Sequence, residues 1–490
     1  MLASSHKERP IRVRMAPSPT GPLHVGGART ALFNWLFARK NGGAFVLRVD
    51  DTDKERSEKK YETELFEGLT WLGMDWDEGP TPTGYKGPYG PYRQSERTDV
   101  YKKYLEMLLA KGDAYYCYCT REDLEAQRQA MLSQGLPPKY NGHCRNIKEP
   151  PAGKNPEVIR FKVPEVKVSF KDLVRSKVTF DAGLFGDQVI AKDLDTPLYN
   201  FATVVDDELM EISHIIRGEE HLSNTPKQIL MQQALGFKEP IYAHIPLLLN
   251  ADRSKMSKRF SDVALLEYHK RGYLSEGMVN FLALLGWHPS GNKEVMSREE
   301  LIKEFDVARV QQAGAVFNEE KLSWINKEHL KNLSAKKIFA LLEPFIKAEP
   351  LTNGREDLDE AFFLRLIEVE RSRANTLNDF IEGCRFFFNL PEYEAAFLAW
   401  KDVPLSGVAS ILNEVLMALK PMPAGDFTPE HLTKILADLI GARNRGEVLW
   451  PLRVALSGER QSPDPVLIMQ VLGKDESLKR ITVAIKKIEP

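Results

Sequence analysis

The chain has little cysteine, no long apolar run and almost no net charge. Four cysteines in 490 residues are too few for a disulfide framework, so we expect a reducing cytoplasm. No apolar run approaches the roughly 20 residues that a membrane-spanning helix needs. The polar N-terminus lacks the apolar core of a signal peptide. These absences argue against a secreted disulfide scaffold and against a membrane protein.

The small net charge leaves the choice of partner open. The formal net charge is −2, with 67 Lys and Arg against 69 Asp and Glu. An RNA partner would therefore have to be held by local basic patches, because the field of the whole protein does not attract it. With 43% hydrophobic and 28% charged residues, the composition is that of an ordinary globular protein. The length predicts roughly three or more domains of about 100–200 residues each.

The first part of the chain alternates strands and helices. Ile11–Ala16 alternates apolar and basic residues and predicts a strand, and Ala28–Arg39 has apolar residues at helical spacing. Phe45–Val49 predicts a second strand, and a second amphipathic helix follows it. This order is typical of a parallel sheet covered by helices, whose ligands bind at the carboxyl ends of the strands.

The alternation is interrupted once and then gives way to helices. It breaks at Gly112–Asn146, turns to short β-like runs through Phe185, and resumes as far as His244–Leu249. We therefore predict one α/β domain split by an insertion of roughly 75–80 residues. From about Leu330 onward the chain is mostly helical, with amphipathic stretches such as Ala361–Leu377.

Two short segments far apart in the chain make chemical sense together. PSPTGPLHVGG (Pro17–Gly27) joins the first strand to the first helix through a turn rich in Pro and Gly, with His24 at the helix entry. Such a turn lets ATP lie against the backbone at a helix N-terminus. KMSKR (Lys255–Arg259) is a cationic loop that can neutralise phosphate charge during nucleotidyl transfer. Taken singly, these are a structural histidine and a solvated basic turn; as a pair they predict an adenylate-forming site.

Eight segments, in order, resemble those of bacterial glutamyl-tRNA synthetases, a class I family. They run from Ile11 to about Leu472 and read PSPTGPLHVGGARTALFNWLFAR, RVDDTD, GPYRQSER, NFATVVDD, HIIRGEEHLSNTPKQIL, KMSKR, GAVFNEEKLSW and PLRVALSG. The resemblance implies a glutamate–tRNA ligase. Such an enzyme activates L-glutamate with ATP and Mg²⁺ to glutamyl-adenylate and transfers it to the terminal adenosine of tRNA(Glu). Members of the family usually need the tRNA for the first step and are usually monomers.

The resemblance also implies a fold class and a domain order. The fold class is α/β: a split Rossmann-type parallel-sheet catalytic domain with an inserted connective domain, followed by an all-α C-terminal anticodon-binding region. We expect the catalytic halves at 1–110 and 188–253 and the inserted acceptor-end domain at 111–187. A stem-contact segment with the KMSKR loop is expected at 254–329, and the helical anticodon-binding region at 330–490.

Family positions imply the catalytic and ATP-binding residues. Adenylation needs no strong general base, because the glutamate α-carboxylate is already an anion; it needs cancellation of charge on the α-phosphate and the departing pyrophosphate. The resemblance assigns that catalytic role to His24, Lys255 and Lys258. It implies ATP binding by Pro17, Thr20, Gly21, His24, Gly26, Gly27, Ser257 and Lys258.

The glutamate pocket is expected to combine a cation and an acid. The family positions are Arg14, Ala16, Ser18, Asp50, Tyr199 and Arg217. An arginine fork binds a carboxylate through two parallel hydrogen bonds, and glutamine would leave a buried guanidinium without a counter-charge. The alternative for Arg217 is a structural salt bridge with Glu219 or Glu220. Asp50 stands where the bacterial family usually has Glu, and we predict a site tuned to the shorter acid.

Three of the four cysteines lie in the predicted insertion. Zinc-bearing members of the family place a histidine two residues after the third cysteine, where this chain has Asn146. Three thiolates still suit zinc, and a tyrosine four residues before the third cysteine matches a ligand used by short relatives. A structural Zn²⁺ site and a degenerate site held by packing alone both stay open. The proposed ligands are Cys117, Cys119, Cys144 and Tyr140.

Three alternatives to a ligase specific for tRNA(Glu) also stay open. A non-discriminating enzyme would charge tRNA(Gln) as well. A non-catalytic tRNA-binding paralogue is disfavoured because the active-site motifs are intact, and a small-molecule nucleotidyltransferase would not need the C-terminal domains. The helical region also contains basic and aromatic residues that suit contact with an unstacked anticodon. Each of them could instead be a solvated charge or a core aromatic. These residues are Arg371–Arg373, Arg443–Arg445, Trp450 and Arg453.

Overall fold

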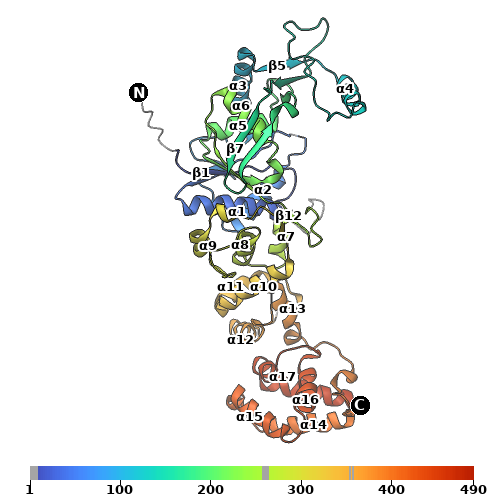
Figure 1. The fold of residues 1–490 in the computed structure, drawn as a ribbon. Helices are drawn as coiled ribbons and strands as arrows, with labels where there is room; N and C mark the ends of the chain where they lie inside the picture. The colour runs from blue at the N-terminus through green and yellow to red at the C-terminus, as the bar shows by residue number, and fades with distance from the viewer. Residues whose placement is uncertain (1–8, 54, 257–263, 353–354, 356–357, 490) are drawn as a thin grey trace. The chain divides into compact units, whose positions relative to one another are not determined.

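The structure is a computed structural model that describes residues 9–489, apart from 54, 257–263, 353–354 and 356–357. The chain divides into two compact units. Unit 1 comprises Met1–Lys270 and Met278–Leu322, and is mixed α/β; unit 2 comprises Arg271–Gly277 and Ser323–Pro490, and is helical (Figure 1). The predicted fold class is confirmed, whereas the predicted five-part division stays a prediction.

The N-terminal strand–helix–strand–helix order has formed as the sequence predicts. Strand β1 (Arg12–Met15) pairs in parallel with β2 (Ala44–Leu47), and all four residues of β1 are buried. Helix α1 (Val25–Lys40) connects them, and α2 (Lys59–Trp71) follows. Strands that are buried on both faces are typical of a parallel sheet between helices.

A second set of parallel strands lies beside β1. Strand β10 (His214–Gly218) pairs in parallel with β11 (Ile241–Ile245), and β11 pairs in parallel with β7 (Lys167–Asp172). Strand β8 (Ser176–Asp181) is antiparallel to β7. The amide of Ser213 donates to the Arg12 carbonyl over 3.0 Å, which sets β10 next to β1. The carboxyl ends of β1 and β10 therefore meet at one edge.

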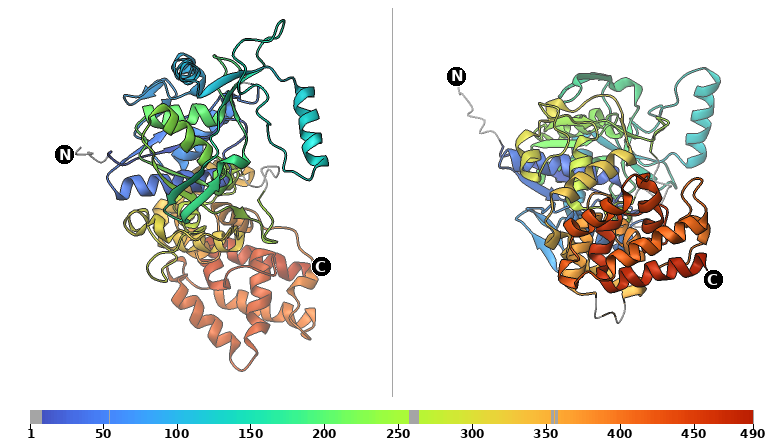
Figure 2. Two further views of the ribbon diagram at one scale, coloured as in Figure 1. Left: turned by 45° about the horizontal axis from the view of Figure 1, so that its top comes forward. Right: turned by 90° about the horizontal axis from the view of Figure 1, so that it is seen from below.

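Helices surround these strands, and a smaller sheet lies apart from them. The helices are α3 (Thr98–Lys111), α5 (Tyr199–Leu209) and α6 (Thr225–Leu235). The smaller sheet is antiparallel, with order β5 (Ala114–Cys117), β6 (Val158–Phe161) and β9 (Gln188–Ala191). Helix α4 (Arg121–Ser133) has no buried residue and lies at the periphery of unit 1 in all three ribbon views (Figure 2).

Short elements complete the part of the chain up to residue 332. Strands β3 (Gly79–Thr81) and β4 (Gly84–Lys86) form an antiparallel pair, and β12 (Leu248–Leu249) and β13 (Ala315–Val316) a parallel pair. The helices here are α7 (Leu265–Lys270), α8 (Ser275–Leu284), α9 (Arg298–Glu304) and α10 (Glu319–Asn332).

Unit 2 continues with seven further helices among the residues that the structure describes. They are α11 (Ala335–Ala348), α12 (Glu360–Glu370), α13 (Leu377–Phe388), α14 (Leu405–Leu419), α15 (Pro429–Ile440), α16 (Arg445–Ser457) and α17 (Pro465–Ile488). The label α17 covers two helical segments joined by a kink at Gly473, whose backbone is not helical. The amphipathic stretch expected at Ala361–Leu377 is interrupted. Helix α12 ends at Glu370, and α13 begins at Leu377, where Thr376 accepts from the Asp379 amide while Asp379 accepts from the Thr376 amide.

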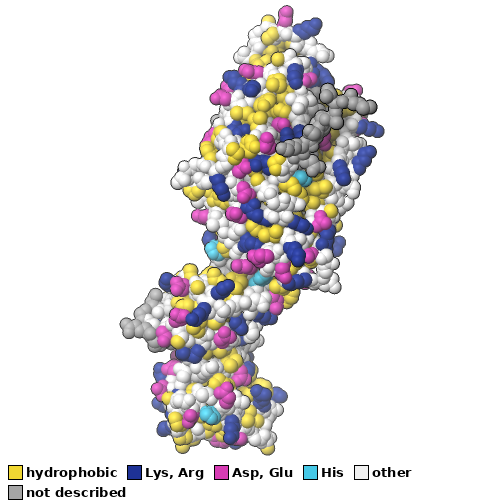
Figure 3. Space-filling view, turned by 90° about the vertical axis from the view of Figure 1, so that its left-hand side faces the viewer, with side chains coloured by type: hydrophobic (Ala, Val, Ile, Leu, Met, Phe, Trp, Pro, Cys, Tyr) yellow, Lys and Arg dark blue, Asp and Glu magenta, His cyan; other side chains and the backbone are white. Residues whose placement is uncertain are grey.

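Charge and apolarity are distributed as the composition predicts. Lys and Arg side chains alternate with Asp and Glu over the face drawn in Figure 3, in keeping with the formal net charge of −2. No described helix is both long and apolar enough to cross a membrane.

Candidate active site

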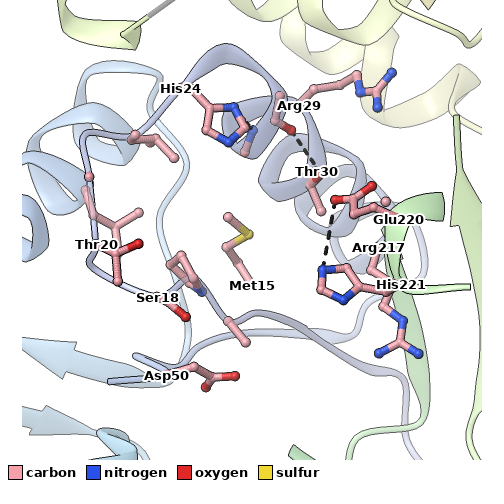
Figure 4. Close-up of a pocket in the computed structure, with 18 of the residues that line it drawn as sticks. Met15, Ser18, Thr20, His24, Arg29, Thr30, Asp50, Arg217, Glu220 and His221 are labelled. Carbon is pink, nitrogen blue, oxygen red and sulfur yellow. Dashed lines mark hydrogen bonds and ion pairs between the residues drawn. The ribbon is translucent and has the colours of Figure 1, made fainter. Parts of the chain in front are cut away.

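A cavity of about 1060 Å³ opens at the carboxyl ends of β1 and β10, within unit 1 (Figure 4). In Figure 4, Thr20 and His24 lie on one side of it, and Arg217 and His221 on the other. All predicted ATP, glutamate and catalytic residues within the described ranges line it: Arg14, Ala16, Pro17, Ser18, Thr20, Gly21, His24, Gly26, Gly27, Asp50, Tyr199, Arg217 and Lys255. Ser257 and Lys258 lie outside the described residues.

His24 is fixed by the helix that it begins. It is the N-cap of α1, with extended backbone (φ −92°, ψ 161°), and its Nδ1 accepts a hydrogen bond from the Gly27 amide over 3.1 Å. A neutral ring that accepts at Nδ1 carries its proton on Nε2. The capping interaction therefore makes Nε2 the donor of this histidine.

Gly26, two residues after His24, leaves space for the His24 ring. A Cβ added to Gly26 would lie 3.0 Å from both Cε1 and Nδ1 of His24, which is closer than nearly all real contacts of this kind. The Gly26 carbonyl in turn accepts from the Thr30 hydroxyl over 3.0 Å. The absence of a side chain at Gly26 is thus a condition for the observed position of His24.

Arg217, at the end of β10, is a buried cation without a carboxylate partner among the described residues. Its side chain donates from Nε to His244 Nε2 (3.2 Å) and from Nη2 to the Thr225 hydroxyl (2.8 Å). Its Nη1 is buried and has no hydrogen-bond partner. Burial lowers the pKa of Arg217 below its ordinary value.

The salt-bridge alternative for Arg217 is not observed. Glu219 instead pairs with Arg175 and accepts from the Leu247 amide (3.0 Å). Glu220 lies 3.9 Å from the His221 Nε2. The positive charge of Arg217 therefore faces the cavity without a carboxylate partner in the part of the chain that the structure describes.

A second fully buried arginine next to the cavity is, by contrast, neutralised by carboxylates. Arg48 donates to both oxygens of Asp50 (2.6 and 3.1 Å) and from Nη1 to Asp207 (2.7 Å). Arg14 binds both oxygens of Asp207 at 3.2 Å. Burial raises the pKa of Asp50 to about 6, although the Arg48 charge opposes this shift. Burial also acts on Asp207, but Arg14 and Arg48 outweigh it and hold its pKa below the ordinary value.

The network ends at Asp206, which neighbours Asp207 on α5. Asp206 accepts from Arg97 Nε (2.7 Å), from the Gln94 amide (2.9 Å) and from the Tyr101 hydroxyl (2.9 Å). Three arginines (Arg14, Arg48, Arg97) thus face three aspartates (Asp50, Asp206, Asp207). Arg217 lies outside this balance, because no carboxylate of the described residues pairs with it.

Lys255 also lines the cavity and is exposed. It forms an isolated bridge with Leu249, and the next residue, Met256, donates its amide to the Leu248 carbonyl over 3.1 Å. The start of the predicted cationic loop is therefore attached to β12 at the cavity wall.

Sequence reasoning missed several residues of the site, namely Arg48, Asp206, Asp207, Thr225, His244 and Asp172. Their signal was present, because charged residues in RVDDTD and NFATVVDD adjoin apolar runs that predict buried elements. Which charges pair across strands and helices depends on tertiary contacts that spacing does not reveal.

The three cysteines of the predicted insertion come together. The Sγ atoms of Cys117, Cys119 and Cys144 all lie within 4.8 Å of one another, and all three residues are buried. The Tyr140 hydroxyl lies 3.5 Å from Cys117 Sγ and 3.7 Å from Cys119 Sγ, and accepts from the Cys144 amide over 2.8 Å. The four predicted ligands thus converge, whereas His143 and Asn146 are exposed.

The anticodon candidates in unit 2 mostly have partners within the unit. Arg443 pairs with Glu414 (2.6 Å), Arg373 pairs with Glu370 (2.8 Å), and the Trp450 indole donates to the Phe397 carbonyl (3.0 Å). Their role toward RNA stays a prediction.

Two family models match the chain. Residues 10–324 match the catalytic domain of class I tRNA synthetases (E and Q), and residues 337–485 match an anticodon binding domain. The first contains the whole cavity, and the second lies within unit 2.

Curated relatives and solved structures agree with these matches. The chain is 43% identical over 479 residues to a glutamate–tRNA ligase of Thermodesulfovibrio yellowstonii, covering 96% of this chain and 98% of the relative. It is 44% identical over 487 residues to glutamate–tRNA ligase 1 of Caldicellulosiruptor saccharolyticus, covering 96% and 98%. The crystal structure of a glutamate tRNA ligase from Elizabethkingia meningosepticum in complex with its amino acid matches with a TM-score of 0.85 at 35% identity, covering 97% of this chain and 99% of that one.

Proposed function

Because the chain belongs to the class I family of glutamate–tRNA ligases, we propose that the cavity of unit 1 holds L-glutamate beside ATP and forms glutamyl-adenylate. The enzyme is an aminoacyl-tRNA ligase that joins glutamate to tRNA and converts ATP to AMP and diphosphate. We further propose which residues bind glutamate and ATP, and how they distinguish glutamate from glutamine.

The uncompensated charge of Arg217 carries the proposal. Glutamate brings two carboxylates and one ammonium, so its net charge of about −1 at neutral pH offsets the unmatched charge of Arg217. We assign its side-chain carboxylate to Nη1 of Arg217, the buried nitrogen that has no partner in the protein. Glutamine would leave this buried guanidinium without a counter-charge, which is the kind of mismatch that enzymes reject strongly.

Asp50 is assigned to the glutamate ammonium. An ionised carboxylate has about four acceptor positions. Arg48 uses one on each oxygen of Asp50. The remaining positions on the cavity side can accept from an ammonium, and the Arg48 pairing fixes the orientation of the carboxylate. Asp50 in this position supports the prediction of a site tuned to the shorter acid.

ATP, which arrives as its Mg²⁺ complex, is assigned to the other side of the cavity. His24 Nε2 and the amides at the start of α1 are donors suited to phosphate oxygens, and Gly26 allows a close approach. The glutamate α-carboxylate oxygen then forms a bond to the α-phosphorus, and the bond from that phosphorus to the oxygen of the departing pyrophosphate breaks. No proton moves in this step. Lys255 offsets the negative charge on the pyrophosphate, together with Lys258, which lies outside the described residues.

Transfer to tRNA completes the reaction. A ribose hydroxyl of the terminal adenosine attacks the adenylate carbonyl; AMP leaves, and the hydroxyl proton is lost to solvent or to the departing phosphate. The anticodon binding domain that matches residues 337–485 accounts for the second contact with tRNA. One chain carries both the catalytic and the anticodon binding domain, which supports our proposal of a monomer; a cytoplasmic location is proposed from the family resemblance.

A structural Zn²⁺ is proposed for the cysteine cluster. Zinc–thiolate bonds of about 2.3 Å in a tetrahedron put sulfurs about 3.8 Å apart. The observed Cys119–Cys144 separation of 3.5 Å and the Tyr140 hydroxyl within 3.7 Å of two thiols fit this geometry. Cys117, Cys119, Cys144 and Tyr140 would hold the ion, which would fix the loop between β5 and β6. Elemental analysis finding well under one zinc per chain would favour the degenerate alternative.

The experiment is aminoacylation of purified tRNA(Glu) and, in parallel, tRNA(Gln) with ¹⁴C-glutamate and ATP. We expect charging of tRNA(Glu). Charging of tRNA(Gln) as well would identify the non-discriminating alternative. Folded protein that charges neither tRNA would sink the assignment of the cavity and favour a tRNA-binding paralogue.

A further inference from the structure

We propose that Asp172, His244 and Thr225 form a relay that orients Arg217 toward the substrate, and so act as positioning residues for the choice of glutamate. None of the three was identified from the sequence. The proposal rests on the proposed function, because it takes the glutamate side chain to be the group that Arg217 binds.

The strand register brings three of these residues into one row. Arg217 on β10 is in register with His244 on β11. Asp172, the last residue of β7, is in register with Tyr242, which lies two residues before His244 on β11 and so on the same face. Directly paired residues on parallel strands present their side chains on the same face. His244 is 0% and Asp172 1% exposed, so the row is closed to solvent.

Asp172 determines which His244 nitrogen carries the proton. Its Oδ1 accepts from the Val174 and Arg175 amides, both at 2.9 Å. Its Oδ2 accepts from the His244 amide (3.0 Å) and lies 2.6 Å from His244 Nδ1. An ionised carboxylate only accepts, so Nδ1 must be the donor. Although burial opposes it, the bond from His244 together with the two amides holds the pKa of Asp172 below its ordinary value.

The proton on Nδ1 makes His244 Nε2 an acceptor for Arg217. Burial lowers the pKa of His244, so the ring is neutral and its Nε2 keeps a lone pair. Arg217 Nε, which can only donate, lies 3.2 Å from this lone pair. The opposite tautomer would set two N–H groups against each other.

Thr225 holds the guanidinium at a second point. Its hydroxyl accepts from Arg217 Nη2 over 2.8 Å and lies 2.9 Å from His244 Nε2. Two of the three guanidinium nitrogens are thus fixed from the protein side, and Nη1 is the one left for a ligand. Asp172 belongs to the segment predicted as an insertion, so the relay also links that segment to the pocket.

A pair of near-isosteric variants tests the relay in the full-length enzyme. Thr225→Val keeps the volume and removes the acceptor of Nη2, whereas Thr225→Ser keeps the hydroxyl. We expect Thr225→Val to raise the KM for glutamate about tenfold or more, as for loss of a hydrogen bond to a charged group. The KM for ATP should stay within about twofold, and Thr225→Ser within about threefold of wild type for both substrates, because the hydroxyl remains.

A second pair separates the two nitrogens of His244. His244→Gln places a carbonyl near the Nε2 position and keeps an acceptor for Arg217, whereas His244→Asn keeps only a group near Nδ1. The relay predicts a higher glutamate KM for His244→Asn than for His244→Gln, by about tenfold. Equal losses in both variants, with the ATP KM rising in parallel, would show a packing role and overturn the proposal.

The tautomer can be observed directly. In ¹⁵N-histidine-labelled wild-type protein, with His244 assigned by substitution, we expect the Nδ1–H form; an Nε2–H form or a charged ring contradicts the relay. Failure of the relay and failure of the proposed function are distinguishable. Wild-type enzyme that charges tRNA with glutamate while Thr225→Val matches it overturns the relay alone, whereas wild-type enzyme that does not use glutamate overturns the assignment of the site.

Discussion

Two buried arginines at one cavity predict opposite responses to the same substitution. Arg48 is 0% and Arg217 4% exposed. Arg48 is bound to Asp50 and Asp207, whereas Arg217 has no carboxylate partner among the described residues. Replacing each by methionine removes one positive charge from the same region. The free energy of unfolding should nevertheless change very differently, because the groups left behind differ.

Arg48→Met leaves a buried carboxylate without its cation. Asp207 keeps Arg14, but Asp50 loses both of its hydrogen bonds to Arg48. Breaking a buried pair in this way costs about 3–5 kcal/mol. In a unit of this size, such a loss lowers the melting temperature by about 5–8 °C.

Arg217→Met leaves no charge behind. His244 Nε2 keeps the Thr225 hydroxyl at 2.9 Å as a donor, so no strong acceptor is orphaned. Removing a buried unpaired cation gains several kcal/mol of desolvation. The loss of two hydrogen bonds, each about 1.5–3 kcal/mol, roughly offsets that gain. We expect a free energy of unfolding within about 1 kcal/mol of wild type, and a fall in kcat/KM for glutamate of about 10²–10⁴-fold from loss of the charged contact at Nη1.

The assay is thermal and urea unfolding of both variants at pH 7.5, with kcat/KM for glutamate measured in parallel. Circular dichroism checks that the helical content is native. If Arg217→Met destabilises as much as Arg48→Met, Arg217 has a hidden counter-charge and the reasoning is refuted. Full activity of Arg217→Met would refute the assignment of Arg217 to the glutamate side chain.

Other perturbations have equally specific outcomes. Because burial raises the pKa of Asp50 to about 6, kcat/KM for glutamate should fall as the pH drops below that value and Asp50 loses the charge that attracts the ammonium; Asp50→Asn should be low at every pH and lack this limb. Asp50→Glu should raise the glutamate KM, and an unchanged KM would count against a site tuned to Asp. Gly26→Ala should raise the ATP KM about tenfold by displacing His24, with little change in glutamate KM, since the added Cβ lies 3.0 Å from the ring. Purified protein should contain one zinc per chain by elemental analysis, and Cys119→Ser should lower that content and the melting temperature together.

Local signals predicted the parts of the site that depend on neighbouring residues. The turn before α1 contains Pro and Gly at positions that end a strand and begin a helix, and His24 caps that helix. The two-residue spacing of Cys117 and Cys119 and the later Cys144 likewise indicated a cluster that the fold assembles. In both cases the residues lie on one turn or on adjacent strands and loops, so spacing carries the information.

The pairing of the buried charged residues could not be predicted from sequence spacing. The pairing of Arg48 with Asp207 joins residues 159 positions apart, and that of Arg217 with His244 requires the register of β10 on β11. Sequence spacing showed that charges follow buried strands but not which ones neutralise each other. The unmatched charge of Arg217, on which the proposal depends, is visible only when its partners are known.

The helix boundary near Glu370 has a similar cause. Apolar spacing continues through Ala361–Leu377, but α12 ends at Glu370, and Thr376 and Asp379 cap a new helix that begins at Leu377. A capping box of four residues, Thr376–Asp379, therefore sets a helix start inside a stretch whose apolar periodicity is continuous.

The central claim is that Arg217 binds the glutamate side chain. Its most direct test is a comparison of glutamate with glutamine, which has nearly the same shape but an uncharged side chain. Wild-type enzyme, ATP and tRNA(Glu) would be supplied with ¹⁴C-glutamate or ¹⁴C-glutamine, and kcat/KM compared. A buried Arg217 that lacks a counter-charge predicts charging with glutamate and a discrimination of about 10⁴-fold or more against glutamine. Comparable use of glutamine would contradict the assignment of Arg217 to the substrate side chain.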